Sequence, residues 1–173
     1  MPKRTREILD LLPRLRRYAI VLARDESAAE DLVQETFLRA EERRSSFDAK
    51  RPLRGWLMSI LHNIFVDTGR AARAREGREA AYASLLDTSM PAPQEMSVHL
   101  AQVRAAFFRM PEDQREALHL IAVEEMSYAE AAALLHIPQG TLMARVSRAR
   151  AALRAFENDE PLRLRIVGGK DAD

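Results

Sequence analysis

The sequence predicts an all-α protein of two small helical domains joined by a flexible linker. Ala and Leu dominate the composition, and Gly occurs only 6 times in 173 residues. Nearly every apolar pattern follows helical spacing instead of the alternation that is typical of strands. Charge placement then divides the chain, because residues 79–103 contain no Lys or Arg while Arg-rich sequence lies on both sides.

The division has its centre at residues 87–95, DTSMPAPQE, whose Pro, Ser and Thr content is typical of a linker. We therefore expect a first domain over residues 1–78 and a linker over residues 79–95. A second domain, which contains a helix-turn-helix, is expected over residues 96–157. Residues 158–173 are expected to form a frayed tail.

Composition excludes several classes of protein. The chain has 27 basic and 26 acidic residues, and 47% of its residues are hydrophobic, as in a globular domain. It contains no Cys, which excludes disulfides and thiolate metal sites. No apolar run is long enough to span a membrane, and the N-terminal segment is interrupted by charges, unlike a signal peptide. We expect a cytoplasmic protein without a membrane partner.

The first strongly periodic segment is residues 26–44, which predicts a helix with an apolar stripe at Ala29, Val33, Phe37 and Ala40. Its outward face mixes acids, an amide and an exposed leucine: Asp31, Gln34, Glu35 and Leu38. Such a face is either a solvated helix surface or a docking surface for a basic partner, and the residues alone leave both interpretations open.

A second helix is predicted to begin near Pro52, with Leu53, Leu57, Ile60, Leu61 and Ile64 gathered on one side. A different side carries a Trp, an amide and Arg residues, which suit single-stranded nucleic acid because rings stack on bases and Arg holds phosphates. The residues concerned are Arg54, Trp56, Asn63, Asp67, Arg70 and Arg73. As an alternative, the only Trp of the chain anchors the domain core; the two roles are compatible.

The segment from Met110 to Glu125 predicts a helix that opens with Pro111 and two acids, and whose apolar side is Leu118, Ile121 and Ala122.

Ser127 and Glu130 then form a capping box, which predicts a short helix from Tyr128 to about His136. Pro138 and Gly140 indicate a turn, and Thr141 is expected to cap the next helix.

That last helix is expected to bury Leu142, Val146, Ala149 and Leu153 and to present a small and basic face: Thr141, Ala144, Arg145 and Arg148. A short helix, a tight turn and a helix with such a face are typical of a helix-turn-helix, whose second helix enters the major groove. A helical hairpin with a solvated basic face is the alternative.

The residues indicate no catalytic chemistry, cofactor or metal site. The four His residues are scattered without ligand spacing, and no Gly-rich phosphate loop, nucleophile elbow or carboxylate pair appears. We expect no enzymatic activity.

Three motifs together resemble the extracytoplasmic-function (ECF, group IV) sigma factors of bacterial RNA polymerase. They are AEDLVQETFLRA at residues 29–40, RGWLMSILHNIFVDTGR at residues 54–70, and the segment from MPEDQRE to RARAAL at residues 110–153. The sequence around Phe47-Asp48 and the segment MPEDQRE resemble the general-stress branch of this family. One departure is Ala144, which stands where the family usually has Ser.

The resemblance implies a promoter-recognising subunit that initiates transcription. It implies docking of Asp31, Gln34, Glu35 and Leu38 on the β′ clamp helices, with the β subunit, promoter DNA and an anti-sigma factor as further partners. It assigns recognition of the minus-ten element to the six residues named above, Arg54, Trp56, Asn63, Asp67, Arg70 and Arg73. It assigns recognition of the minus-thirty-five element to the last helix, with Thr141, Ala144, Arg145 and Arg148. The alternatives are a helix-turn-helix regulator of duplex DNA that is not a sigma subunit, and an adaptor with a sigma-like fold.

Overall fold

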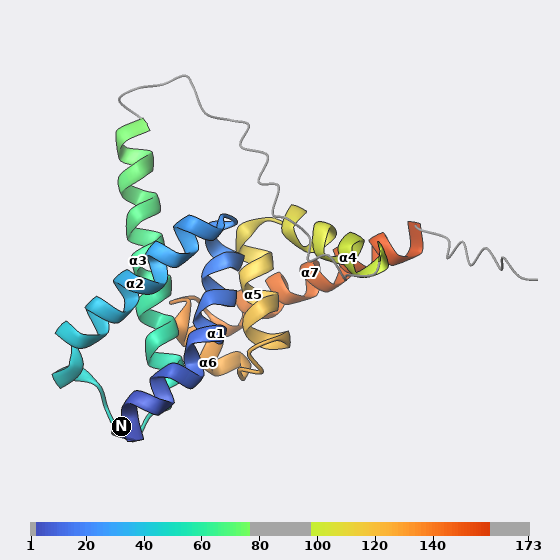
Figure 1. Ribbon diagram of the computed structural model, residues 1–173. Coiled ribbons are helices and arrows are strands. Elements are labelled where there is room, and N and C mark those ends of the chain that lie inside the picture. The colour runs from blue at the N-terminus through green and yellow to red at the C-terminus, as the bar shows by residue number, and fades with distance from the viewer. Residues whose placement is uncertain (1–2, 77–97, 160–173) are drawn as a thin grey trace, which may run out of the picture.

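The computed structural model describes residues 3–76 and 98–159, and side chains over residues 6–69 and 100–156 (Figure 1). The described residues are helical and contain no strand, which confirms the predicted all-α fold. The predicted linker, residues 79–95, and residues 160–173 of the predicted tail lie outside them.

The first half holds α1, α2 and α3 with one short 3₁₀ turn, and the second half holds four α-helices. Their bounds are α1 Lys3–Ala23, α2 Glu26–Glu42, η1 Arg44–Ser46, α3 Leu53–Glu76, α4 Val98–Arg109, α5 Glu112–Ala122, α6 Tyr128–Leu134 and α7 Gln139–Asp159.

Helix α1 was not predicted, although its apolar residues follow helical spacing. Its charges and an internal proline, Pro13, obscure the pattern. Leu15, Ala19 and Leu22 are buried, and α1 contacts both α2 and α3. Helix α1 is therefore the centre of the first domain.

Helix α2 begins at an Asp25 N-cap, whose carboxylate accepts a hydrogen bond from the Ala28 N–H at 2.8 Å. It ends at Glu42, two residues before the predicted end. The predicted stripe is correct in that Ala29, Val33 and Ala40 are buried.

Helix α3 starts at Leu53, as predicted from Pro52, and buries Leu57 and Leu61 against the other two helices. Its C-terminal half extends beyond the packed body of the first domain (Figure 1).

In the second half, α7 packs against α4, α5 and α6. The two halves also pack on each other, since α1 contacts α5 and α3 contacts α6, and their buried apolar residues form one continuous cluster. Helix α5 thus lies between α1 and α7 (Figure 1).

This sandwiched position corrects one prediction. The apolar side of α5 was expected to include Ala122, which is exposed; Leu118 is buried and Ile121 half-buried. Instead, all six residues from Arg115 to Leu120 are buried, because neighbours cover both sides of the helix.

Candidate nucleic-acid interface

The turn between α6 and α7 is built by local hydrogen bonds. The predicted capping box is present: the Ser127 hydroxyl accepts from the Glu130 N–H at 3.2 Å, and the Glu130 carboxylate accepts from the Ser127 N–H at 2.9 Å. The Ser127 hydroxyl and N–H bonds lower the pKa of Glu130, which is thereby held as a carboxylate.

Helix α6 ends in a Schellman motif. The His136 N–H donates to the Ala133 carbonyl at 3.3 Å, and the Ile137 N–H donates to the Ala132 carbonyl at 3.1 Å. His136 has φ 53°, the left-handed conformation that reverses the chain. The reversal directs Pro138 into the start of α7.

Helix α7 supplies the predicted recognition face. Leu142, Val146 and Ala149 are buried as expected, which turns the opposite side outward. Thr141 is not the N-cap, because α7 begins at Gln139 and the Leu142 N–H already bonds the Pro138 carbonyl at 3.1 Å. The four candidate side chains are exposed or half-buried: Thr141, Ala144, Arg145 and Arg148.

Arg145 is held by a neighbouring helix. Its Nε lies 3.2 Å from Oδ2 of Asp113, in the first turn of α5, and its side chain is 25% exposed. The ion pair fixes the guanidinium near α5 instead of leaving it free in solvent. No sequence pattern indicates this pair, since Asp113 and Arg145 are far apart in the chain.

The second candidate face lies on α3. Arg54, Trp56 and Asn63 are half-buried and Asp67 is exposed. Arg70 and Arg73 belong to α3, but their side chains lie outside those described. The Trp56 ring packs on Phe47 with centroids 4.9 Å apart and planes at 50°, so it is partly anchored and partly accessible.

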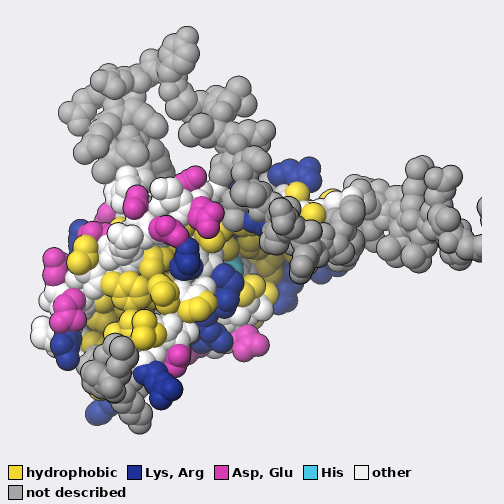
Figure 2. Space-filling view, in the orientation of Figure 1, with side chains coloured by type: hydrophobic (Ala, Val, Ile, Leu, Met, Phe, Trp, Pro, Cys, Tyr) yellow, Lys and Arg dark blue, Asp and Glu magenta, His cyan; other side chains and the backbone are white. Residues whose placement is uncertain are grey.

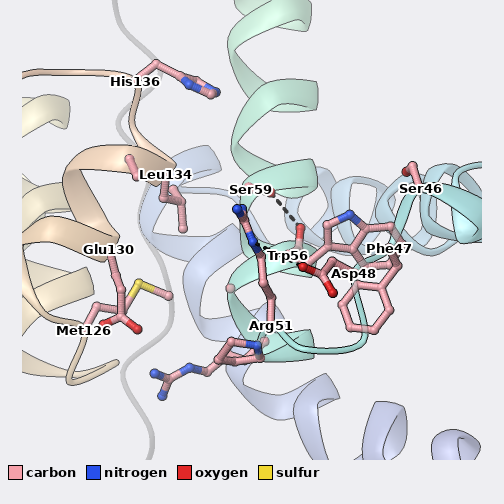
Figure 3. A pocket seen from close by; sticks show the side chains of 14 residues that line it. Ser46, Phe47, Asp48, Arg51, Trp56, Ser59, Met126, Glu130, Leu134 and His136 are labelled. Carbon is pink, nitrogen blue, oxygen red and sulfur yellow. Dashed lines mark hydrogen bonds and ion pairs between the residues drawn. The ribbon is translucent and has the colours of Figure 1, made fainter.

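Trp56 lines a groove of about 640 Å³ between the two halves. Phe47, Arg51 and Trp56 form one wall, and the opposite wall comes from α6 and the residues around it (Figure 3). The residues of that opposite wall are Met126, Glu130, Ala133, Leu134 and His136.

A third face lies on α2. Asp31 and Gln34 are exposed, and Leu38 is 62% exposed. Glu35 is half-buried and accepts from Nε of Arg39 at 3.0 Å. Hydrophobic side chains gather over the region of α1 and α2 in Figure 2, with acidic side chains around them.

The contact between the halves contains buried polar groups that the sequence did not reveal. Oε1 of Glu116 in α5 accepts from the Tyr18 hydroxyl at 2.5 Å and lies 2.8 Å from Nδ1 of His62. Tyr18 is fully buried, and burial followed by the Glu116 charge raises its pKa well above the ordinary value. The tyrosine therefore stays protonated and donates to the carboxylate.

Arg115 is buried beside Glu116. Its Nε donates to the Val21 carbonyl at 2.7 Å, in the last turn of α1, and its Nη1 donates to the Met110 carbonyl at 2.9 Å. A cation at a helix C-terminus satisfies carbonyls that have no intrahelical partner. Burial is the main cause that lowers the pKa of Arg115.

Two further groups complete the contact. Oε2 of the fully buried Glu124 lies 3.3 Å from Nη1 of Arg14. The His119 ring stacks on Tyr18 at 5.7 Å with planes 3° apart, and burial, then Arg17, lowers its pKa to about 4. His119 is thus neutral at pH 7, and its Nε2 lies 3.7 Å from Oε1 of Glu124, beyond hydrogen-bond distance.

Within the described residues, no group of three or more His, Asp or Glu side chains could hold a metal ion, and no helix is long and apolar enough to cross a membrane.

A helix-turn-helix with a partly basic outer face, joined to a helical domain with an accessible Trp, defines a two-domain DNA-binding transcription factor.

Comparison with known proteins specifies the class. Residues 8–75 match the family Sigma-70 region 2, and residues 100–153 match Sigma-70, region 4. The chain is 41% identical to the ECF RNA polymerase sigma factor EcfG of Rhodopseudomonas palustris, over 94% of each chain. The chain belongs to the ECF sigma factors of RNA polymerase.

Solved structures agree. The sigma factor RpoE of Bartonella quintana, solved with the anti-sigma factor NepR, has a TM-score of 0.78 and 34% identity, and the match covers 93% of this chain and all of RpoE. CnrH, solved with the cytosolic domain of CnrY, has a TM-score of 0.62 and 28% identity over 89% and 86% of the chains.

The protein is accordingly a promoter-recognising sigma factor, and the family implies RNA polymerase and promoter DNA as partners. Sigma factors recognise promoters and are not themselves the catalysts of transcription. The alternative of a duplex-DNA regulator that is not a sigma subunit is not favoured, because it leaves the region 2 match unexplained.

Proposed function

We propose that the exposed face of α2, formed by Asp31, Gln34, Glu35 and Leu38, docks on the β′ clamp helices of core RNA polymerase. The observation that carries this assignment is Leu38, a large apolar side chain that is 62% exposed beside exposed acidic and amide side chains. An apolar anchor with a polar rim is typical of a protein interface.

The outer face of α7 is proposed to read the minus-thirty-five element. Ala144 permits close approach to the major groove, while Arg145 and Arg148 supply donors for guanine edges or phosphates. Thr141 is exposed one turn before Arg145 and supplies a hydroxyl for a phosphate.

The α3 face is proposed to hold the unpaired strand of the minus-ten element. Arg54, Trp56, Asn63 and Asp67 lie along this helix, and Arg70 and Arg73 follow in the same helix. Extruding a base costs a few kcal/mol, which stacking on an aromatic ring and contacts to the base edge offset.

An anti-sigma factor is proposed as a further partner. RpoE and CnrH, which the chain resembles, were each solved with a second protein, named for RpoE as an anti-sigma factor. The apolar side chains gathered over α1 and α2 are suited to such a partner (Figure 2).

Leu38→Ala tests the α2 assignment. Burial of a leucine at an interface contributes about 1.5–3 kcal/mol, so the variant should bind core RNA polymerase at least about tenfold more weakly in a fluorescence-anisotropy titration. Leu9→Ala is the matched control, since Leu9 is 52% exposed on α1.

Equal affinities of the two variants for core polymerase would contradict the α2 assignment. Transcription in vitro from the promoter upstream of the protein's own gene, with core enzyme and each variant, then tests whether binding loss and activity loss agree.

A further inference from the structure

The contact between the two domains is held by charged and polar side chains, all of which are buried except the half-buried Arg14. Each bond of the set joins one domain to the other: Tyr18 and His62 to Glu116, Arg14 to Glu124, and Arg115 to the Val21 carbonyl. We call these side chains the interdomain latch: Arg14, Tyr18, His62, Arg115, Glu116 and Glu124.

The closed arrangement of the two domains is stable only while the buried carboxylates of the latch keep their partners. The side chain of Glu116 is 7% exposed and that of Glu124 is 0% exposed. A carboxylate at such a position is tolerated only while it is hydrogen-bonded or paired. When the domains separate, water solvates the same groups, so loss of one partner penalises the closed arrangement alone.

Closure also restricts access to the α3 face. Trp56 and Arg54 line the groove between the domains. Helix α6 forms the wall opposite Trp56 (Figure 3). A melted DNA strand is continuous and needs an open track along α3. In the closed arrangement such a strand would have to share the groove with α6, whose Glu130 also lines it.

We propose that the interdomain latch holds the free protein in a closed, self-masked state in which the second domain covers the minus-ten face of the first. In this closed state the surface of α1 and α3 is occupied by α5 and α6 of the same chain. Binding of the unpaired minus-ten strand requires the latch to open, and the masking part of this proposal rests on the proposed role of Trp56.

Opening is measured first, without DNA. Because the chain has no Cys, Glu41→Cys and Ala155→Cys, at exposed positions on α2 and α7, accept a donor and an acceptor dye for single-molecule energy transfer. Tyr18→Phe and Arg14→Gln should each raise the ratio of open to closed molecules, on the order of tenfold, since each leaves a buried carboxylate short of a partner.

Matched controls carry the same chemical changes away from the contact. Arg16→Gln removes an ion pair with Glu30 inside the first domain. Tyr128→Phe removes a hydroxyl on α6 for which no cross-domain hydrogen bond is present among the described residues. Both controls should retain the closed population of the unsubstituted protein.

Masking is measured next through the fluorescence of Trp56, the only Trp of the chain, titrated with single-stranded oligo-dT. An apparent dissociation constant scales inversely with the fraction of binding-competent molecules. Tyr18→Phe and Arg14→Gln should therefore bind about tenfold more tightly than the unsubstituted protein, although neither adds a contact to DNA.

The outcomes separate the two proposals. Unchanged energy transfer in both latch variants, or a free protein that is already open, would overturn the latch. Opening with no gain in DNA affinity would overturn the masking. Opening in the latch variants with no DNA binding by any variant would instead refute the role of Trp56 and support the latch.

Discussion

His119 makes the stability of the protein depend on pH below neutrality. Burial holds the pKa of His119 at about 4 in the folded chain, against 6.5 for an exposed histidine. The folded pKa is the lower one, so the unfolded chain takes up the proton first as the pH falls. Stability is therefore complete above pH 6.5 and is lost as the pH falls toward 4.

The size of the effect follows from the two pKa values. Lowering the pH from 7 to 5 should remove about 2 kcal/mol from the free energy of unfolding through this one residue. His119→Phe keeps an aromatic ring against Tyr18, with which His119 stacks at 5.7 Å, and abolishes the titration.

Urea unfolding, followed by circular dichroism at pH 7 and pH 5, measures this difference. The variant should lose about 2 kcal/mol less than the unsubstituted protein between the two pH values, whatever its stability at pH 7. An equal loss in both proteins would refute the reasoning, because the proton would then be taken up elsewhere.

Four further predictions concern the second domain. Ser127→Ala removes the N-cap of α6 and the hydrogen bond to the Glu130 N–H, which should lower the free energy of urea unfolding by about 1 kcal/mol. Leu142→Ala, at a fully buried position of α7, should cost about 2–5 kcal/mol in the same assay. Arg145→Ala should weaken binding to a minus-thirty-five duplex by about 1–3 kcal/mol, as measured by fluorescence anisotropy, if the side chain contacts a base. Asp113→Asn, which releases the Arg145 guanidinium, should change that affinity without lowering the melting temperature by more than a few degrees.

The elements that could be predicted from the sequence are those governed by local rules. The capping box at Ser127 and Glu130 fixed the start of α6, and Pro52 fixed the start of α3 to within one residue. The buried sides of α2, α3 and α7 followed from helical spacing, because each of these helices has one solvent-facing side.

The rest depended on contacts between distant residues. A prediction from helical spacing assumes that a helix buries one side. The prediction for α5 was therefore incomplete, because neighbouring helices cover α5 on two sides. Nothing in the sequence marks Arg115, Glu116 and His119 as buried, since a charged residue is buried only when its partner is present. Those partners are 94 residues away for Arg115 and 98 for Glu116.

That separation has a consequence for the order in which the chain acquires its structure during synthesis. A ribosome releases α1 long before α5, so the Val21 carbonyl and the Tyr18 hydroxyl meet only water until residues 115 and 116 emerge. The nascent first domain is therefore less stable than the same domain in the finished protein. Helix α5, which belongs to the second domain by sequence, thus adds stability to the first.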